Sequence, residues 1–365
     1  MTDEIWTVQR LLKTSTEWLQ RQQLPSPRRD AEHLLCHVTG LTRVGLYTSF
    51  DRPVSEDELA TYRALVARRA RHEPIAYLTG SAGFWTLELR TDARALIPRP
   101  ETELLIERVL AHIPASHRDQ PWRVVDVGTG TGALAIALAT ELPNATVVAI
   151  DVSPEALELA RENVLAHGLG DRVHLVHGDL LDRLVRKGSR ADVIVSNPPY
   201  VGESERALMD PGVAAHEPER ALFAGPAGFD LIDRLLPQAR DVLAPGGVFV
   251  MEFGSPQGDG IRARADKLGL PWTVHQDLAG HDRALELRAP GRSPLMGEAS
   301  RPSTGAPASP APVALTSGDE SFAPDGGRDG ELAAPVDERE LRNLSGLYGG
   351  ETGTEPLPVI DLNEQ

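Results

Sequence analysis

The sequence lacks several features that define whole classes of protein. Its 365 residues include one cysteine, so an internal disulfide is impossible and a disulfide-stabilised secreted fold is excluded. No apolar stretch reaches the roughly 18 residues that span a bilayer. The N-terminus carries Asp3 and Glu4 in place of a basic leader segment. We therefore expect a soluble cytoplasmic protein without a membrane partner.

Positive charge is also scarce. The chain has 37 Lys and Arg against 53 Asp and Glu, which gives a net charge of -16. Residues 290–365 hold 5 Arg and 13 acids and so contribute -8, and residues 1–289 contribute the other -8. Neither part has the basic excess of a protein that neutralises many nucleic-acid phosphates. We expect a monomer that does not bind nucleic acid directly.

Composition and periodicity divide the chain into four parts. Residues 1–80 have apolar positions at three- and four-residue spacing, which predicts a small helical domain. Residues 81–120 are expected to form a connecting hairpin and helix. In residues 121–289, β-branched runs alternate with helical stretches, which is typical of a mostly parallel, doubly wound α/β sheet. Residues 290–365 hold 10 Pro and 11 Gly but few apolar residues, which predicts a disordered tail.

The α/β part can be divided into individual elements. Three helices are expected, at residues 133–141, 155–166 and 229–243. The expected strands are 123–127, 146–150, 173–177, 192–196, 248–253, 272–276 and 284–288.

A glycine-rich turn follows the first expected strand, in the run Asp126-Val-Gly-Thr-Gly-Thr-Gly132. Glycines at a strand-to-helix turn let backbone amides approach a ligand closely. The run also fits the G-x-G-x-x-A form of the dinucleotide fingerprint, so a nicotinamide-dependent oxidoreductase stays open as an alternative. The candidate cofactor-binding residues here are Asp126, Gly128, Thr129, Gly130, Thr131 and Gly132.

Two acidic residues extend the predicted cofactor site along the same edge of the sheet. Asp151 ends the second strand, where a carboxylate can accept hydrogen bonds from both hydroxyls of a ribose. It indicates a nucleoside-containing cofactor but does not separate NAD from S-adenosylmethionine. Asp179 follows the third strand and could meet an adenine amino group, although an ordinary loop Asp is an equal alternative.

The run Asn197-Pro198-Pro199-Tyr200 ends the strand 192–196. Two prolines fix the backbone, so the Asn197 side-chain oxygen and the Pro198 carbonyl are held in place. Two such acceptors could bind the hydrogens of a planar NH2 group, aim its nitrogen at an electrophile and stabilise the transition state. Tyr200 would pack against the flat face of the target. We therefore regard these four residues as candidate catalytic and substrate-binding residues, and Asn197 also as a cofactor contact.

These motifs resemble those of a known family. The runs 126–132 and 197–200 are similar to class I S-adenosylmethionine-dependent methyltransferases that modify planar nitrogens. Within that class, the run Leu96-Ile-Pro-Arg-Pro-Glu-Thr-Glu-Leu104, followed by Glu217-Pro218 and Glu252-Phe-Gly254, resembles the HemK/PrmC family over about residues 1–289. The resemblance implies a Rossmann-like methyltransferase domain behind a helical substrate-recognition domain.

The resemblance also implies an activity. The family transfers a methyl group from S-adenosyl-L-methionine, leaving S-adenosyl-L-homocysteine, to the glutamine amide nitrogen of the GGQ motif in peptide chain release factors. Arg99, Glu101 and Glu103 are then expected near the site, with Arg99 and Glu101 as substrate contacts. Leu180, where the family often has Trp, is expected on the adenine side of the cofactor. No metal is required.

Two other functions remain open. An amino-group methyltransferase acting on adenine or guanine in DNA or RNA would also hold a planar NH2, and the same Asn-Pro-Pro-Tyr turn could clamp a flipped base. The acidic charge of the chain argues against it. A non-catalytic binding protein on the same fold would bind cofactor without turnover.

Overall fold

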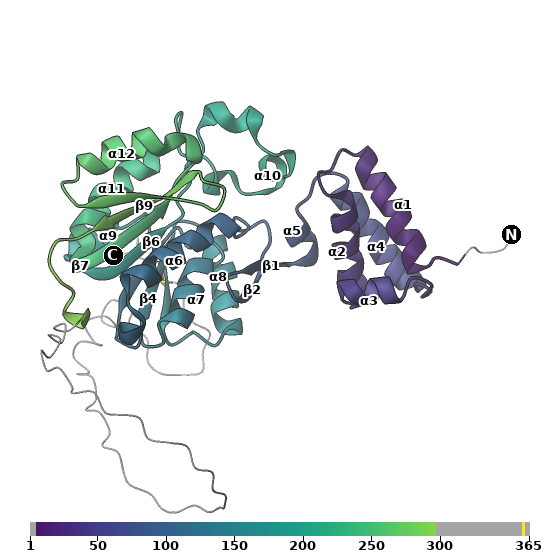
Figure 1. Cartoon of the computed structure of the whole chain (residues 1–365), viewed down its shortest axis with the longest axis horizontal. Coiled ribbons are helices and arrows are strands. Elements are labelled where there is room, and N and C mark those ends of the chain that lie inside the picture. The colour runs from purple at the N-terminus through teal and green to yellow at the C-terminus, as the bar shows by residue number, and fades with distance from the viewer. Residues whose placement is uncertain (1–4, 297–359, 362–365) are drawn as a thin grey trace, which may run out of the picture. The chain divides into compact units, whose positions relative to one another are not determined.

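The first part of the chain is helical. The computed structural model describes residues 5–296 and 360–361, so most of the tail predicted for residues 290–365 lies outside the described residues. Buried apolar side chains of these helices, among them Leu12, Leu34 and Tyr62, form one core. Five helices precede the first strand (Figure 1): α1 (Val8–Arg21), α2 (Pro27–Thr39), α3 (Arg43–Thr48), α4 (Glu56–Arg69) and α5 (Ile75–Thr79).

A hairpin and a helix connect these helices to the main sheet. Strands β1 (Ser81–Phe84) and β2 (Leu87–Arg90) pair antiparallel, and the 3₁₀ turn η1 (Pro100–Thr102) leads into α6 (Glu103–His112). Phe84 of the hairpin belongs to the same buried cluster as side chains of α6 and the sheet. The hairpin and α6 therefore belong to the same hydrophobic core as the main sheet.

One sheet organises the rest of the described chain, with the strand order β10-β5-β4-β3-β6-β7-β9-β8. Strands β3 to β7 and β10 run parallel to one another, whereas β9 is antiparallel to both β7 and β8. The predicted α/β class, mostly parallel with an antiparallel strand near the C-terminal end, is confirmed. The strands are β3 (Arg123–Val127), β4 (Thr146–Asp151), β5 (Val173–His177), β6 (Ala191–Ser196), β7 (Leu243–Glu252), β8 (Trp272–Gln276), β9 (Asp282–Arg288) and β10 (Ile360–Asp361).

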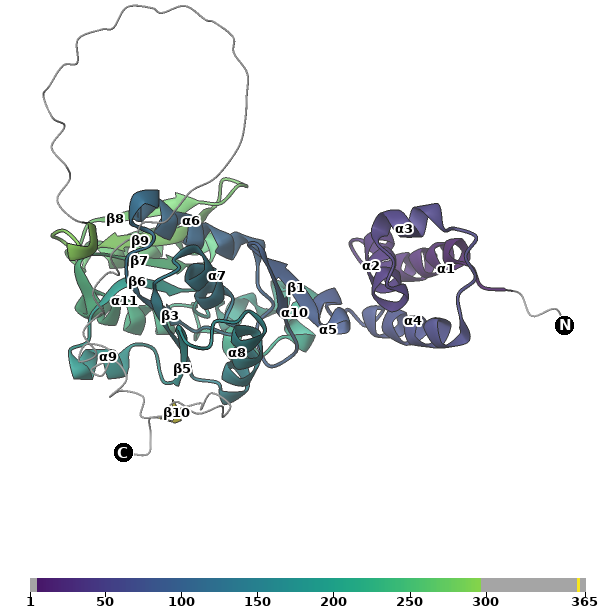
Figure 2. The same cartoon turned by 90° about the horizontal axis from the view of Figure 1, so that it is seen from below.

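Helices cover both faces of this sheet (Figure 2). On one face α6 packs on α7 (Ala133–Glu141), which with α8 (Pro154–Ala166) contacts β4 and β5. On the other lie α9 (Asp182–Lys187), α11 (Asp230–Val242) and α12 (Gly258–Asp266), all labelled in Figure 1. Helix α10 (Pro211–His216) belongs to the connection between β6 and α11. Because both faces are covered, the central strands are apolar, and every residue of β6 is buried.

Most of the expected elements lie within two residues of their predicted bounds. Strand β7 differs, because it begins at Leu243, five residues before the predicted start. Its Leu243 still pairs with Ala191 across a register shift, although the following Pro-Gly-Gly is typical of a turn. Helix α12 was not predicted, since its two glycines disfavour a helix. Gly260 is needed there because a Cβ would lie 2.6 Å from the Phe229 ring.

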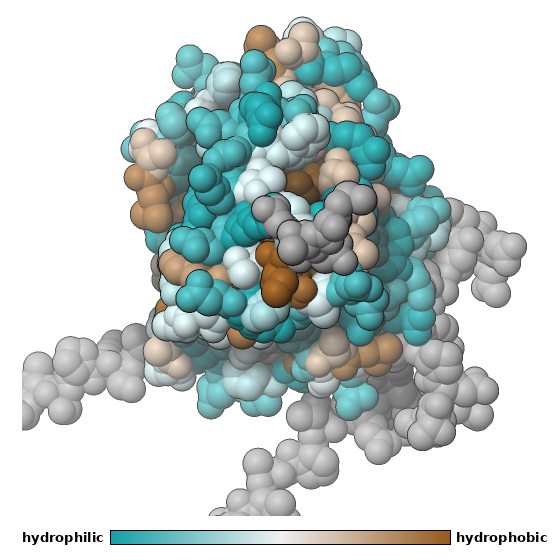
Figure 3. Space-filling view, turned by 90° about the vertical axis from the view of Figure 1, so that its right-hand side faces the viewer, coloured by the Kyte–Doolittle hydropathy of each residue, from teal (hydrophilic) through white to brown (hydrophobic). Residues whose placement is uncertain are grey.

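The face of the molecule drawn in Figure 3 is mainly polar. In the view of Figure 3, hydrophilic side chains predominate and hydrophobic ones form small separate groups. The large apolar side chains that are exposed include Ile5, Val44, Leu208 and Leu278. Within residues 5–296 and 360–361, no helix is both long and apolar enough to cross a membrane.

Candidate active site

A cavity of about 160 Å³ opens at the carboxyl edge of the sheet, where β3, β4, β5 and β6 end. Open parallel sheets bind ligands at this edge. The glycine-rich turn forms one wall and the run 197–199 forms another. Eleven of the residues predicted from the sequence line it: Arg99, Gly128, Thr129, Gly130, Thr131, Asp151, Asp179, Leu180, Asn197, Pro198 and Pro199.

The backbone conformation of the glycine-rich turn makes one wall of the cavity. Gly128 and Gly130 have φ values of 72° and 55°, which side chains other than glycine rarely tolerate. The amides of Gly128 and Thr129 donate to the Ile150 carbonyl, at 2.8 and 3.0 Å, and tie the turn to β4. A Cβ on Gly128 would lie 3.8 Å from the Asn197 carbonyl oxygen. The missing side chain therefore leaves space between the two walls.

Asp126 and Gly132, also predicted as cofactor residues, are not among the described residues that line the cavity. Asp126 is 1% exposed, and its Oδ2 accepts hydrogen bonds from the Thr129 hydroxyl at 2.6 Å and the Ala135 amide at 3.2 Å. Burial raises the pKa of Asp126 to about 7, against the lowering effect of these two donors. Both residues therefore support the turn, and their direct contact with a cofactor stays a prediction.

Asp151 faces the cavity from the end of β4. Its Oδ2 accepts a hydrogen bond from the Gly130 amide and its Oδ1 accepts one from the Ser153 amide, both at 2.9 Å. Burial raises the pKa of this carboxyl, while the backbone donors lower it. Each oxygen keeps a further lone pair, so the carboxylate can still accept hydrogen bonds from a pair of ligand hydroxyls.

Asp179 and Leu180 line the cavity beyond the end of β5. The Asp179 carboxylate is exposed and accepts a hydrogen bond from Arg234 at 2.5 Å. Leu180 has a φ of 50°, which is uncommon for a residue other than glycine. The next amide, that of Leu181, donates to Gln238 of α11 at 2.8 Å. Helix α11 thus holds this strained turn against the cavity.

The run 197–200 begins where β6 ends. Asn197 donates a hydrogen bond from Nδ2 to the Thr102 hydroxyl at 3.0 Å, and Pro198 is buried. Tyr200, in contrast, is not among the described residues that line the cavity. Its hydroxyl donates to Glu252 at 3.0 Å, and burial beside this carboxylate raises the pKa of Tyr200. Packing of its ring against a target group therefore stays a prediction.

The three charged residues around η1 have different surroundings. Arg99 lines the cavity and forms an ion pair with Glu217 at 2.5 Å. Glu103 accepts a hydrogen bond from the Trp85 amide at 2.7 Å and so anchors the hairpin. Glu101 is exposed. Neither glutamate is among the described residues that line the cavity, so contact of Glu101 with a substrate stays a prediction.

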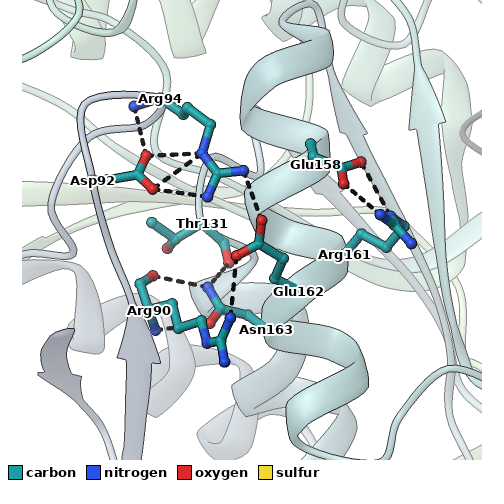
Figure 4. Close-up of polar contacts among 8 residues, drawn as sticks. All are labelled: Arg90, Asp92, Arg94, Thr131, Glu158, Arg161, Glu162 and Asn163. Atoms are coloured by element: carbon teal, nitrogen blue, oxygen red, sulfur yellow. Dashed lines mark hydrogen bonds and ion pairs between the residues drawn. The ribbon is translucent and has the colours of Figure 1, made fainter. Parts of the chain in front are cut away.

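The segment after β2 forms part of the cavity wall and is clamped to α8 (Figure 4). Arg94, which lines the cavity, donates to Asp92 and, at 2.8 Å, to Glu162. The buried Asn163 amide accepts from the Arg90 amide at 2.8 Å and donates to the carbonyls of Arg90 and Thr131, at 3.0 and 2.9 Å. One satisfied side chain therefore joins the hairpin, the glycine-rich turn and α8.

Sequence reasoning gave no role to three buried polar residues at this site. Glu217, Glu252 and Thr102 are 4%, 1% and 5% exposed, and each contacts a predicted site residue. One pattern in the sequence could have identified Glu252, because it is a single carboxylate at the end of an apolar strand. Such a group is costly to bury unless other residues donate to it.

Comparison with known proteins gives consistent matches along the chain. Family models match at residues 10–80, described as the PrmC N-terminal domain, and at residues 101–210, described as the methyltransferase small domain. The release factor glutamine methyltransferase of Rhodopirellula baltica is 41% identical over 290 residues, which is 78% of this chain and 97% of that protein. That of Chlorobaculum tepidum is 39% identical over 79% of this chain and 99% of that protein.

Among solved structures, a release-factor-specific protein-(glutamine-N5) methyltransferase from Alicyclobacillus acidocaldarius is 26% identical. The match covers 53% of this chain and 94% of that chain, with a TM-score of 0.34.

Proposed function

The chain belongs to the family of release factor glutamine methyltransferases, and we propose that it methylates the side-chain amide nitrogen of a glutamine in a peptide chain release factor. The observation that supports this proposal most directly is the pair of acceptors at one wall of the cavity. The Asn197 amide donates a hydrogen bond from Nδ2 to Thr102, which leaves its Oδ1 as an acceptor. Pro198 offers a backbone carbonyl in the same wall.

The opposite wall fits S-adenosyl-L-methionine as the methyl donor. The turn at 128–131 presents backbone amides, the Asp151 carboxylate keeps lone pairs for ribose hydroxyls, and the missing Gly128 side chain leaves room beside Asn197. When bound there, this cosubstrate supplies a methyl group activated by a positively charged sulfur. The proposed contacts are those of the lining residues named above, with Leu180 and Asp179 toward the adenine.

Asn197 and Pro198 then orient the nitrogen that attacks. The lone pair of an amide nitrogen is delocalised, so the free group is a poor nucleophile. Acceptors on both of its hydrogens hold the nitrogen in line with the methyl carbon. As the nitrogen–carbon bond forms and the carbon–sulfur bond breaks, the nitrogen becomes positive and these hydrogen bonds strengthen. One proton then leaves to water, and S-adenosyl-L-homocysteine is the other product.

We assign the recognition of the protein substrate to the helices of residues 1–80, with residues 81–120 as the connection and residues 121–289 as the methyltransferase domain. Support comes from the family model for residues 10–80, which is distinct from the methyltransferase model. We propose a cytoplasmic location because release factors act in translation, and a monomeric enzyme without direct nucleic-acid binding.

Methyl transfer from labelled S-adenosyl-L-methionine tests the proposal. The full chain is offered, in parallel, a release factor with an intact GGQ motif, the same protein with that glutamine replaced, duplex DNA and total RNA. We expect label on the intact release factor alone. Label on DNA or RNA would favour the amino-group methyltransferase of nucleic acids, and binding of the donor without transfer to any of the four would favour a binding protein.

A further inference from the structure

Asn197 is the last member of a short chain of hydrogen bonds that begins in the core. Its Nδ2 donates to the Thr102 hydroxyl at 3.0 Å, and that hydroxyl donates to Oε2 of Glu252 at 2.5 Å. The other Glu252 oxygen accepts from the Tyr200 hydroxyl at 3.0 Å. Glu252 is 1% exposed and Thr102 5% exposed, so both lie out of water.

The chemistry of these groups gives the chain a direction. While Glu252 is ionised, its carboxylate can only accept hydrogen bonds, so the single hydroxyl proton of Thr102 is committed to it. Burial raises the pKa of Glu252, and the hydrogen bonds from the Thr102 and Tyr200 hydroxyls lower it and favour the ionised form. Thr102 then has only lone pairs to offer Asn197. The Asn197 amide must therefore turn its NH2 end toward Thr102, and its Oδ1 is left for the cavity. In the flipped amide, two oxygens with no proton between them would face each other.

We propose that Thr102 and Glu252 are positioning residues that fix which end of the Asn197 amide faces the substrate nitrogen. The proposal rests on the proposed function, since it is the hydrogens of a glutamine NH2 that need an acceptor there. A flipped Asn197 would present NH2 to NH2 and could not orient the attack. Thr102 lines the cavity and Glu252 does not, and both act on the transfer step through Asn197.

The decisive variant is Thr102→Val, which keeps the shape of the side chain but removes its oxygen. Without that acceptor, both orientations of the Asn197 amide become accessible. We expect kcat to fall about tenfold, the size of one net hydrogen bond, while the affinity for S-adenosyl-L-methionine changes less than about twofold. Thr102→Ser keeps the oxygen and should restore most of kcat. An unchanged kcat in Thr102→Val would overturn the proposal.

The matched control is Thr91→Val. Thr91 is 2% exposed, its hydroxyl has no hydrogen-bond partner among the described residues, and it does not line the cavity. The same change in a buried threonine should leave kcat as it is. An equal loss of kcat in this control would mean that the effect at Thr102 comes from general repacking, and the proposal would fail.

A double-mutant cycle separates positioning from a merely structural role. If Thr102 acts through Asn197, Thr102→Val should cost little further activity in an Asn197→Ala background, measured in single turnovers with labelled donor. Two additive losses, or a lower thermal midpoint that accounts for the loss, would overturn the proposal. Should Thr102→Val fold poorly, Thr102→Ala replaces it in the same cycle.

Activity of the wild-type chain distinguishes failure of the proposed methyl transfer from failure of the positioning role of Thr102 and Glu252. Should the wild-type chain transfer no label to the release factor, the proposed function fails before any variant is compared. If the wild type is active and Thr102→Val has the same kcat, the positioning role is refuted and the proposed function still stands.

Discussion

The two walls of the cavity are built in different ways. The glycine-rich turn in the cofactor wall is closed by residues near in sequence: Thr129 donates to Asp126 and the Gly130 amide donates to Asp151, across 3 and 21 positions. The opposite wall is assembled from distant segments, because Asn197 bonds to Thr102 across 95 positions and Thr102 bonds to Glu252 across 150. The glycine-rich turn depends mainly on backbone conformation, whereas the opposite wall depends on a network of side chains.

This difference predicts different consequences of mutation. Changes in the glycine-rich turn or at Asp151 should act on the binding of the methyl donor or on folding, since these residues present amides and a carboxylate to the cavity. Changes around Asn197 should act on the transfer step, since that wall faces the reacting nitrogen. Substitutions at Asn197 and at Asp151 test whether the two walls are separable in this way.

The largest effect is expected for Asn197→Ala. Loss of the Oδ1 acceptor should lower kcat by about 10² to 10³, by analogy with removal of one group that stabilises a transition state. The affinity for S-adenosyl-L-methionine, measured by calorimetry, should change less than about threefold. Asn144→Ala, at an exposed asparagine, is the matched control with unchanged kcat. A variant with near-normal turnover would refute the role of Asn197.

Asp126→Asn should change the pH dependence of stability. In the folded chain the pKa of Asp126 is about 7, above its ordinary value of 3.8. Between these pH values the folded state holds a proton that the unfolded state has lost, so the free energy of unfolding falls as the pH rises. The amide introduced by the substitution cannot ionise. From pH 5 to pH 8 the variant should therefore gain about 2 to 3 kcal/mol relative to wild type.

Urea unfolding at the two pH values checks this prediction. Parallel pH profiles for the two proteins would show that Asp126 is already ionised at pH 5 in the folded chain. The supporting role of the buried carboxyl beneath the turn would then need a different electrostatic account.

The features that the sequence predicts are mainly those of the glycine-rich turn and its neighbouring elements, where the signal is local. Strand β3, the turn 126–132 and helix α7 were predicted to the residue, because the apolar run, the glycines and the next apolar run are contiguous. The ends of parallel strands also share one edge by topology, so the sequence alone places Asp151, Asp179 and Asn197 together.

The parts that could not be predicted depend on tertiary contacts. No local pattern says that Thr102 will meet Glu252, or that the Tyr200 hydroxyl will bond to Glu252. Asp126 was expected at the ligand because it begins the glycine-rich run. Its carboxyl is bonded to Thr129 and Ala135, which depends on the packing of α7 on β3, and its contact with a ligand stays a prediction.

Asp151→Asn tests the binding wall more directly. The amide keeps the shape of the carboxylate but loses its charge and one of its two acceptors for ribose hydroxyls. We expect the Kd for S-adenosyl-L-methionine to rise about tenfold, the loss of roughly one hydrogen bond to a charged group, with kcat at saturating donor nearly unchanged. Asp259→Asn, at an exposed acid of α12, is the control. A loss confined to kcat would mean that the two walls are not separable.

The smallest effect is expected for Arg234→Ala. The ion pair between Arg234 and Asp179 is about half exposed on both sides, so water screens it. We expect the free energy of unfolding to change by less than about 1 kcal/mol.

The same ion pair also tests the binding wall, because Asp179 lies at the proposed adenine side. If its carboxylate accepts the adenine amino group, Asp179→Ala weakens donor binding while Arg234→Ala does not, and calorimetric titration of both variants decides it. Equal losses in the two variants would instead mean that the ion pair only holds the turn at Leu180 in shape.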